Sequence, residues 1–312
     1  MPQPMRRKKM VAAPRQQQQM SPNSGGSSKI YQLTDEHEAE ALKFLSSRSV
    51  DALYMTGLIQ DNGMESPFNR GAFYAFRDDE ERLQGIALIG HATLVETKSE
   101  TALAAFAQLA RAFAHAHVIV GDQEKVERFW KYFAGGTHVE PRLICRELLF
   151  EQRLPIAALE PVEGLRQATL DDLLPVMAVQ ARLAEDESGI NPLEVDPEGF
   201  QLRLKRRIEQ GRVWVWIEMG RLIFKVDIMS ETEDVIYLEG VFVHPEERGK
   251  GYGLRCMSQT GRRLLARVGT LCLLVNERNK DAQSFFFKAG YKLRDCYDTI
   301  FLSQQINSNV LG

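Results

Sequence analysis

The 312-residue chain is poor in cysteine, nearly balanced in charge and without a long apolar run. Its four cysteines, Cys145, Cys256, Cys272 and Cys296, show no metal-ligand spacing, so we expect reduced thiols rather than a disulfide scaffold or a metal site. The 39 Lys and Arg residues nearly balance 42 Asp and Glu, which removes the electrostatic argument for nucleic acid. No stretch reaches the length of a membrane span. The composition predicts a cytoplasmic protein without metal, nucleic-acid or membrane partners, and it leaves the oligomeric state open.

Length and local composition divide the chain into three parts. A chain of 312 residues suggests about two domains, and 44% apolar residues suffice for their cores. Residues 1–28 are rich in Pro, Gln, Ser and Gly and carry a basic cluster at Arg6–Lys9, so we predict a disordered tail. That cluster can touch RNA or an acidic partner, although a solvated tail is the simpler interpretation. The predicted domains are then 29–152 and 153–312.

One junction in the second domain has the composition of a phosphate-binding turn. A strand-like run ends at Val243, and the glycine-rich segment Arg248–Gly253 follows, ahead of an amphipathic helix pattern. Glycines let a backbone turn sharply and approach a ligand, and the amides at a helix N-terminus favour an anion. A P-loop is excluded because no Ser or Thr follows Lys250, and a dinucleotide fingerprint is excluded because its third glycine would be Cys256. The segment predicts a pyrophosphate site of another kind.

A second motif follows the first in the chain. The apolar strand pattern Leu271–Val275 precedes Asn276 and Asn279, then Ala282, the aromatic run Phe285–Phe287 and Gly290-Tyr291. The two motifs together resemble motifs A and B of the GNAT superfamily of acyl-CoA N-acyltransferases. The resemblance covers about residues 163–303. It implies an α/β (α+β) fold with a mixed, mostly antiparallel central sheet flanked by helices.

The first domain shows a similar order of elements but lacks the glycine motif. Strand patterns at 72–76, 83–89, 92–96 and 118–120 alternate with helix patterns at 101–114 and 124–133, and a last strand pattern covers 143–150. After the strand near Val95 comes the acidic, glycine-free Glu96–Glu100. We therefore predict a degenerate GNAT-like domain that binds no CoA, as in tandem bacterial GNAT proteins with one active half. Tyr74, Asp122 and Trp130 can line a ligand cleft, or they are simply core and surface residues.

The resemblance implies acetyl-CoA as co-substrate and assigns residues to it. The backbone of the glycine motif would hold the pyrophosphate, and the strand before it would lie along the pantetheine arm, with a backbone N–H of Val241 or Val243 donating to the thioester carbonyl. The expected cofactor-binding residues are Val241, Phe242, Val243, Arg248, Gly249, Lys250, Gly251, Tyr252, Gly253, Asn276, Asn279 and Phe286. No metal is implied.

Amine acylation requires a base when the acceptor is strongly basic. A lysine-like amine with a pKa of about 10.4 costs about 4.6 kcal/mol to deprotonate at pH 7, whereas an α-amino group costs about 1.4 kcal/mol. Glu239 is the candidate catalytic base, because strand alternation predicts that it shares a face with Val241 and Val243. The alternative is an exposed strand carboxylate or a structural ion pair. Asp227 is a weaker substitute, and His244 fits a surface histidine.

Two features leave the activity and the acceptor open. Many GNAT enzymes use a tyrosine to protonate the departing thiolate, and here Phe286 occupies that position. The acidic run Glu185–Gly189 can attract a cationic amine, or it is a solvated helix end. We therefore predict an N-acetyltransferase that moves an acetyl group from acetyl-CoA to the amine of a small molecule or protein. The alternative is a non-catalytic acyl-CoA sensor, and in a third hypothesis the first domain recruits a protein acceptor.

Overall fold

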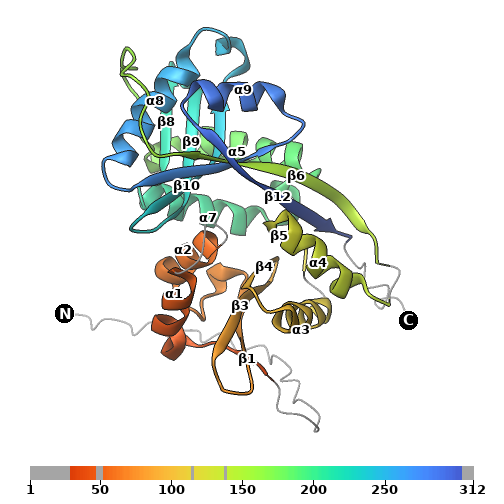
Figure 1. Ribbon diagram of the computed structural model, residues 1–312. Coiled ribbons are helices and arrows are strands. Elements are labelled where there is room, and N and C mark those ends of the chain that lie inside the picture. The colour runs from red at the N-terminus through yellow and green to blue at the C-terminus, as the bar shows by residue number, and fades with distance from the viewer. Residues whose placement is uncertain (1–28, 47–51, 114–115, 137–138, 304–312) are drawn as a thin grey trace, which may run out of the picture.

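The protein is built on one continuous sheet. The computed structural model describes residues 29–46, 52–113, 116–136 and 139–303, so the predicted disordered tail lies outside the described residues. In these ranges twelve strands pair in the order β1-β2-β3-β4-β5-β12-β6-β11-β10-β9-β8-β7. Neighbouring strands are antiparallel except for the pairs β4–β5 and β10–β11. This mixed, mostly antiparallel sheet with flanking helices confirms the predicted fold class (Figure 1).

The elements follow one another in two similar series. We call residues 29–152 the N-terminal half and residues 153–303 the C-terminal half. The first series is β1 (Ile30–Gln32), η1 (Asp35–His37), α1 (Glu38–Ser46), α2 (Leu53–Asn62), η3 (Pro67–Asn69), β2 (Gly71–Arg77), β3 (Leu83–Gly90), β4 (Ala92–Thr97), α3 (Glu100–Arg111), β5 (Val118–Asp122), α4 (Gln123–Ala134) and β6 (Pro141–Gln152). The second is β7 (Arg166–Gln167), η4 (Leu170–Asp172), α5 (Leu173–Ser188), α6 (Pro192–Val195), α7 (Pro197–Glu209), β8 (Val213–Glu218), β9 (Arg221–Glu231), β10 (Val235–Val243), η5 (Pro245–Glu247), α8 (Tyr252–Leu265), β11 (Thr270–Asn276), α9 (Lys280–Lys288) and β12 (Lys292–Leu302).

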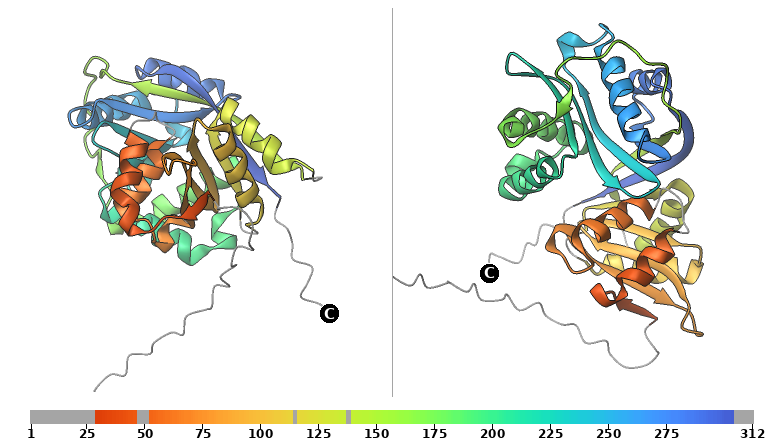
Figure 2. Two further views of the ribbon diagram at one scale, coloured as in Figure 1. Left: turned by 60° about the horizontal axis from the view of Figure 1, so that its bottom comes forward. Right: turned by 90° about the vertical axis from the view of Figure 1, so that its left-hand side faces the viewer.

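Helices cover both faces of the sheet in each half. In the C-terminal half, α8 and α9 lie on one face, and α5 and α7 lie on the other (Figure 2). Buried Met257 and Leu264 of α8 and Phe286 of α9 pack with strand residues on the first face, and Val176 of α5 and Leu204 of α7 do so on the second. In the N-terminal half, α1 and α2 share one apolar cluster while α3 and α4 share another. Each half therefore has its own pair of cores.

The last strand of each half crosses to the other half. β6 pairs with β11 and β12, and β12 pairs with β6 and β5, so both strands run through the middle of the molecule (Figure 1). The two halves therefore exchange their last strands reciprocally. The predicted division at residue 152 stays a proposal, because the strand that ends there completes the sheet of the C-terminal half.

Helix α2 packs across the junction between the halves. Gly57 allows this approach, because an added Cβ would lie 1.9 Å from Ser230 Oγ on β9. The Ser230 hydroxyl donates to the Leu53 carbonyl at 2.8 Å, and Arg212 forms an ion pair with Asp61 at the other end of the helix. Arg206 also donates to the Asp61 carbonyl at 2.8 Å. The two halves are thus joined by side-chain contacts as well as by the exchanged strands.

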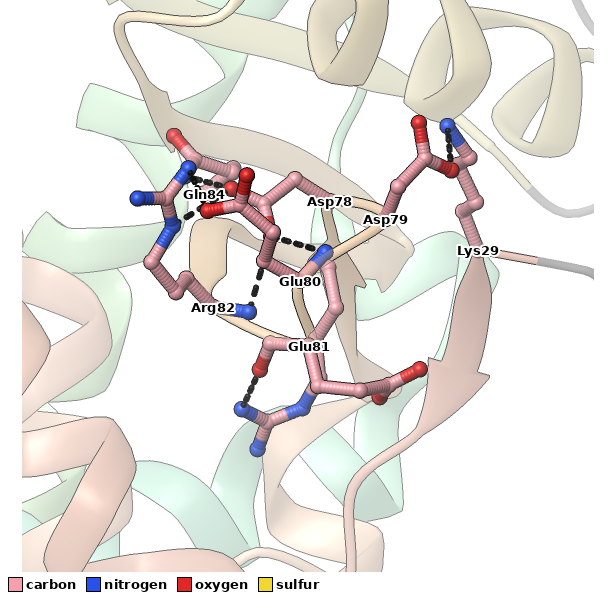
Figure 3. A network of polar contacts seen from close by, with 8 residues as sticks. Lys29, Asp78, Asp79, Glu80, Glu81, Arg82 and Gln84 are labelled. Carbon is pink, nitrogen blue, oxygen red and sulfur yellow. Dashed lines mark hydrogen bonds and ion pairs between the residues drawn. The ribbon is translucent and has the colours of Figure 1, made fainter.

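Hydrogen bonds within the β2–β3 turn fix its shape. Asp78 accepts from the backbone N–H of Glu80 and of Arg82 and from the side chains of Arg82 and Gln84 (Figure 3). Burial alone would raise the pKa of the Asp78 carboxyl, but these hydrogen bonds lower it to about 2. Glu81 has a positive φ of 61° within this turn. The network holds a turn that carries no glycine at its tip.

Most elements lie where the sequence predicts them, with a few differences. The sequence also shows helix patterns at 35–45, 50–59 and 197–210 and a hairpin signal at 213–226. These elements and the helices at 101–114 and 124–133 are present, apart from positions in the ranges 47–51 and 114–115, which lie outside the described residues. Met219 and Gly220 at the hairpin tip both have positive φ, at 48° and 76°, as a tight two-residue hairpin requires. Leu174 was expected on the buried face of α5, but it is 69% exposed. No sequence pattern was assigned to β1 or β12.

Candidate active site

The parallel strands β10 and β11 pair at their beginnings and then separate. Their register covers Val235–Leu238 with Thr270–Leu273, and the described strands continue to Val243 and Asn276 without further pairing to each other. A bulge lies in β10 between Glu239 and Phe242, where Gly240 has a φ of 59°. The opening between these two strands is the place in the sheet where a ligand can reach both faces.

A buried lysine holds this bulge. The Lys225 side chain on β9 is fully buried, and its Nζ donates to the Gly240 carbonyl at 3.2 Å and to Gln180 Oε1 at 2.6 Å. It also lies 2.8 Å from Asp227 Oδ1, and Arg207 contacts the other oxygen of Asp227 at 3.0 Å. An added Cβ on Gly240 would come within 2.7 Å of Lys225 Nζ. Both carboxylate oxygens of Asp227, the weaker candidate base, thus contact basic side chains.

The bulge places neighbouring residues of β10 on different faces of the sheet. Tyr237 and Glu239 line a cavity on the α5 side, whereas Val241 and Val243 pack against the α8 and α9 cluster and Phe242 packs with the α5 and α7 cluster. The expectation that Glu239 shares a face with Val241 and Val243 is therefore wrong, because the extra residue at the bulge reverses the alternation. Glu239 approaches the opening from one side and the two valines from the other.

The glycine motif forms an open turn at the start of α8. Gly249 and Gly251 have φ angles of 75° and 84°, and a Cβ added to either would meet nothing within 4 Å. Gly251 is the N-cap and offers no side-chain acceptor, and the first turn of α8 contains no acidic residue. The first amides of α8 therefore face unfilled space at the positive end of the helix dipole. The residues present fit a pyrophosphate.

The remaining residues of the motif have structural partners. Gly253 allows α8 to approach β10, because an added Cβ would lie 2.8 Å from Val243 Cγ2. Lys250 forms an ion pair with Glu247 at 3.0 Å, and the Tyr252 ring lies 5.0 Å from the Trp216 ring. Arg248 donates through Nε to the Val243 carbonyl at 3.1 Å and forms no ion pair with any carboxylate of the described residues. Arg248 therefore keeps a positive charge beside the turn.

The residues expected from motif B lie beside the opening, where their contacts are structural. Asn279 is the N-cap of α9 and accepts from the Ala282 N–H at 3.0 Å, and Asn276 accepts from the Arg278 N–H at 2.9 Å. Phe286 is buried among Phe150 and Tyr291. Their predicted contacts with the CoA arm stay a prediction.

The cavity on the other side of the opening lies between the two halves. Its volume is about 360 Å³. Its walls come from α2, β4 and β5 of the N-terminal half and from α5, β9, β10 and β11 of the C-terminal half, and the exchanged strands β6 and β12 contribute Glu147, Leu149, Tyr297, Thr299 and Phe301. The strand exchange therefore forms part of the cavity wall.

Three carboxylates from separate elements face this cavity. Glu239 of β10 is half-buried, Glu147 comes from β6, and Glu187 comes from the last turn of α5. Burial raises the pKa of Glu239, an effect that Arg207 opposes and Asp227 strengthens. Burial and then the charges of the other two carboxylates raise the pKa of Glu187. A carboxyl whose pKa is raised toward neutrality is a better general base at that pH.

Several other residues proposed from the sequence take structural roles. Within the acidic run at the end of α5, all three carboxylate side chains are exposed, and Glu187 and Ser188 line the cavity. His244 is half-buried and caps the turn η5 through the Glu246 N–H. Asp122 caps α4.

Two aromatic residues that the sequence offered as possible cleft residues pack inside the N-terminal half. Tyr74 packs edge-on against Phe113, and Trp130 stacks on Phe133. Neither residue lines the cavity between the halves. Their interpretation as core residues therefore fits the structure better than a role in ligand binding.

Comparisons with known proteins agree with this geometry. Residues 209–293 match the model of the acetyltransferase (GNAT) domain. Among solved structures, a Drosophila protein has a TM-score of 0.66 at 13% identity, covering 88% of this chain and 99% of that one. A GNAT-family acetyltransferase from Colwellia psychrerythraea has a TM-score of 0.56 at 12% identity, with 88% and 100% covered. A tandem GNAT protein from the clavulanic acid biosynthesis pathway has a TM-score of 0.57 at 14% identity, with 87% and 98% covered.

A search of curated proteins finds no match. Within the C-terminal half the match to the GNAT acetyltransferase domain is limited to residues 209–293, and the chain as a whole has a fold like that of a tandem GNAT protein. Within the described ranges, no helix is long and apolar enough to cross a membrane.

Proposed function

We propose that this protein is an acyl-CoA-dependent N-acetyltransferase that transfers an acetyl group from acetyl-CoA to a primary amine by direct attack in a ternary complex. The supporting observation is the arrangement at the bulge in β10. On one face, the open turn Arg248–Gly253 and the strand end at Val241–Val243 can hold the pyrophosphate and the pantetheine arm. On the other face, Glu239 lines a cavity that is large enough for an acceptor. The two substrates can therefore meet in the opening between β10 and β11.

Bound acetyl-CoA supplies the acetyl group as an activated thioester, and the chain supplies the positioning and the base. Glu239 takes a proton from the attacking amine, directly or through water. A lysine-like amine needs this help most, because its deprotonation at pH 7 costs about 4.6 kcal/mol. The bulge leaves the strand end at Val241–Val243 next to the same opening, where a backbone N–H can donate to the thioester carbonyl.

The test is the release of free thiol from acetyl-CoA in the presence of a panel of primary amines. Glu239→Gln should lower kcat/KM for a lysine-like acceptor by about 10²–10⁴-fold, the usual contribution of a general base, and leave the Kd for acetyl-CoA unchanged. Glu218→Gln is the matched control, since Glu218 is an exposed carboxylate at the end of β8. Full activity of the Glu239→Gln variant would rule out the assigned base.

A second candidate is an acyl-CoA-binding protein that no longer transfers. Phe286 favours it, because this buried side chain has no hydroxyl to protonate a departing thiolate. The chemistry does not demand one, since thiols titrate near pH 8.5 and a thiolate leaves readily. The same assay separates the two candidates. Binding of acetyl-CoA without thiol release from any amine in the panel would favour the binding protein.

A further inference from the structure

The cavity between the halves brings three carboxyl groups together. Among the described residues, Glu147, Glu187 and Glu239 form no ion pair within 4.0 Å, and the side-chain partner of Glu147 is the Thr299 hydroxyl at 2.6 Å. Within the same ranges, no group of three or more His, Cys, Asp or Glu side chains could hold a metal ion. Uncompensated carboxylates in a half-buried cavity favour an organic cation. This end of the cavity suits an ammonium group.

The N-terminal half places an arginine on the same cavity. Arg70 follows η3, has a positive φ of 53° and is exposed at the cavity lining. Its guanidinium contacts His91 Nδ1 at 3.0 Å and forms no ion pair with any described carboxylate. Burial, then the charges of Arg70 and His117, lower the pKa of His91 to about 3, so the imidazole is neutral at pH 7. The guanidinium keeps its full charge for a ligand.

The positive and negative groups lie at different ends of the cavity. Arg70 contacts His91, which directly precedes β4, and β5 and β12 lie between β4 and β6, the strand that carries Glu147. Tyr54 of α2 lines the same cavity. The rest of the lining is mainly apolar and aromatic, with Leu53, Met229, Tyr237, Leu274, Tyr297 and Phe301.

From this charge arrangement we infer that the acceptor is an amino acid whose carboxylate is separated from its reactive amine by an apolar spacer. The ammonium end lies at Glu147, Glu187 and Glu239, and the carboxylate end lies at Arg70. The inference rests on the proposed function and deepens it. It also gives the N-terminal half a role in acceptor recognition, since Arg70 of that half would bind the unreactive carboxylate end of the acceptor.

The experiment compares three six-carbon amines that differ at one end: ε-aminocaproate, hexylamine and hexamethylenediamine. The full chain is assayed with acetyl-CoA, and kcat/KM is measured for each. A charge-assisted contact of the carboxylate with Arg70 should favour ε-aminocaproate over hexylamine by about tenfold, with hexamethylenediamine the poorest. Shorter and longer ω-amino acids, from γ-aminobutyrate upward, then locate the best spacer.

Variants separate the two ends of the acceptor. Arg70→Gln should bring the kcat/KM ratio of ε-aminocaproate to hexylamine close to one, and Glu147→Gln should lower kcat/KM for all three amines together. Arg111→Gln is the control, because Arg111 lies at the end of α3 and contacts the Gly135 carbonyl. Thermal unfolding of each variant confirms that it is folded.

Two outcomes overturn the inference while leaving the proposed function intact: a preference for the diamine, or a carboxylate preference that Arg70→Gln does not change. If no amine is acetylated, the proposed function fails, and the inference is then decided by calorimetric binding of ε-aminocaproate and hexylamine to the protein with acetyl-CoA. Tighter binding of ε-aminocaproate that disappears in Arg70→Gln supports it. Equal or undetectable binding of the two ligands contradicts it.

Discussion

The two halves contain the same strand–helix–strand unit, but the helices begin differently. In the N-terminal half, Ser99 caps α3 by accepting from the Ala102 N–H at 3.3 Å, and Glu100 adds a negative charge in the first turn. In the C-terminal half, α8 begins at Gly251, with no side-chain cap and no acidic residue in its first turn. Ser99 thus satisfies one free amide of α3, whereas no side chain caps α8. In the proposed function, these few residues at a helix end separate a binding half from a degenerate half of similar fold.

The strands before these helices differ in the same way. β4 pairs with β3 without an irregularity, whereas β10 contains the bulge at Gly240. Glu96, near the end of β4, forms an ion pair with Lys125 at 2.9 Å. A straight strand whose carboxylate is paired forms a packed connection. A bulged strand followed by glycines forms a site that is open on both faces.

The largest predicted effect is the loss of folding when the C-terminal half is made without the exchanged strand β6. A fragment of residues 155–312 lacks β6, so the six β11 residues Leu271–Asn276 lose their partners and expose an apolar strand edge. We expect this fragment to aggregate or stay unfolded. A fragment of residues 139–312 keeps β6 and should be soluble and bind acetyl-CoA. Circular dichroism and calorimetry measure both, and a folded, CoA-binding 155–312 fragment would show that the exchange is dispensable.

The next effect is on acetyl-CoA binding at the open helix end. Gly251→Glu places a carboxylate in the anion site and forces a side chain into a left-handed backbone, which costs about 1–2 kcal/mol. We expect the Kd for acetyl-CoA to rise at least about tenfold. Gly136→Glu is the matched control, because Gly136 has a similar φ of 75° and equally open surroundings in the N-terminal half. Equal effects of the two variants would mean that strain, and not the site, explains the loss.

The pH dependence of kcat/KM tests whether Glu239 is the catalytic base. Glu239 acts in its deprotonated form, and burial raises its pKa above the ordinary value of 4.5. Activity should therefore be lost as the pH falls through this raised pKa, at a higher pH than for an exposed glutamate. The charges of Arg207, Asp227 and Lys225 act on the same carboxyl and set how far its pKa is raised. A kcat/KM profile that keeps the same acidic limb in Glu239→Gln would assign that limb to another group.

The smallest predicted effect is at the capped helix end. Ser99→Ala removes the side-chain cap of α3 and should lower the free energy of unfolding by about 1 kcal/mol. Binding of acetyl-CoA should not change, because this end holds no ligand. Urea unfolding and calorimetry measure the two quantities. A change in acetyl-CoA affinity would place α3 in the binding site after all.

The sequence predicts the secondary-structure elements and turns well, because strand patterns, helix caps and glycine turns depend on neighbouring residues. The Met219-Gly220 hairpin and the turn before α8 are examples. The bulge was missed although Gly240 inside a strand pattern was a signal for one. The bulge at that single residue places Glu239 on the opposite face of the sheet from Val241 and Val243.

The cavity between the halves could not be predicted from the sequence, because it depends on contacts between distant segments. Glu147 belongs in chain order to the N-terminal half, and it comes near Glu239 because β6 pairs with β11 and β12. Arg70 and Tyr54 lie in segments without any motif. Their role follows from how α2 packs across the junction, which local patterns do not specify.

The central claim is that one half binds acyl-CoA and the other does not. Titration of acetyl-CoA into the full chain by calorimetry tests it directly, with a Gly251→Glu and Gly253→Glu double variant beside it. We predict one equivalent for the wild-type protein and no binding for the variant. Two equivalents would contradict the degenerate N-terminal half, and no binding to the wild-type protein would contradict the site at α8.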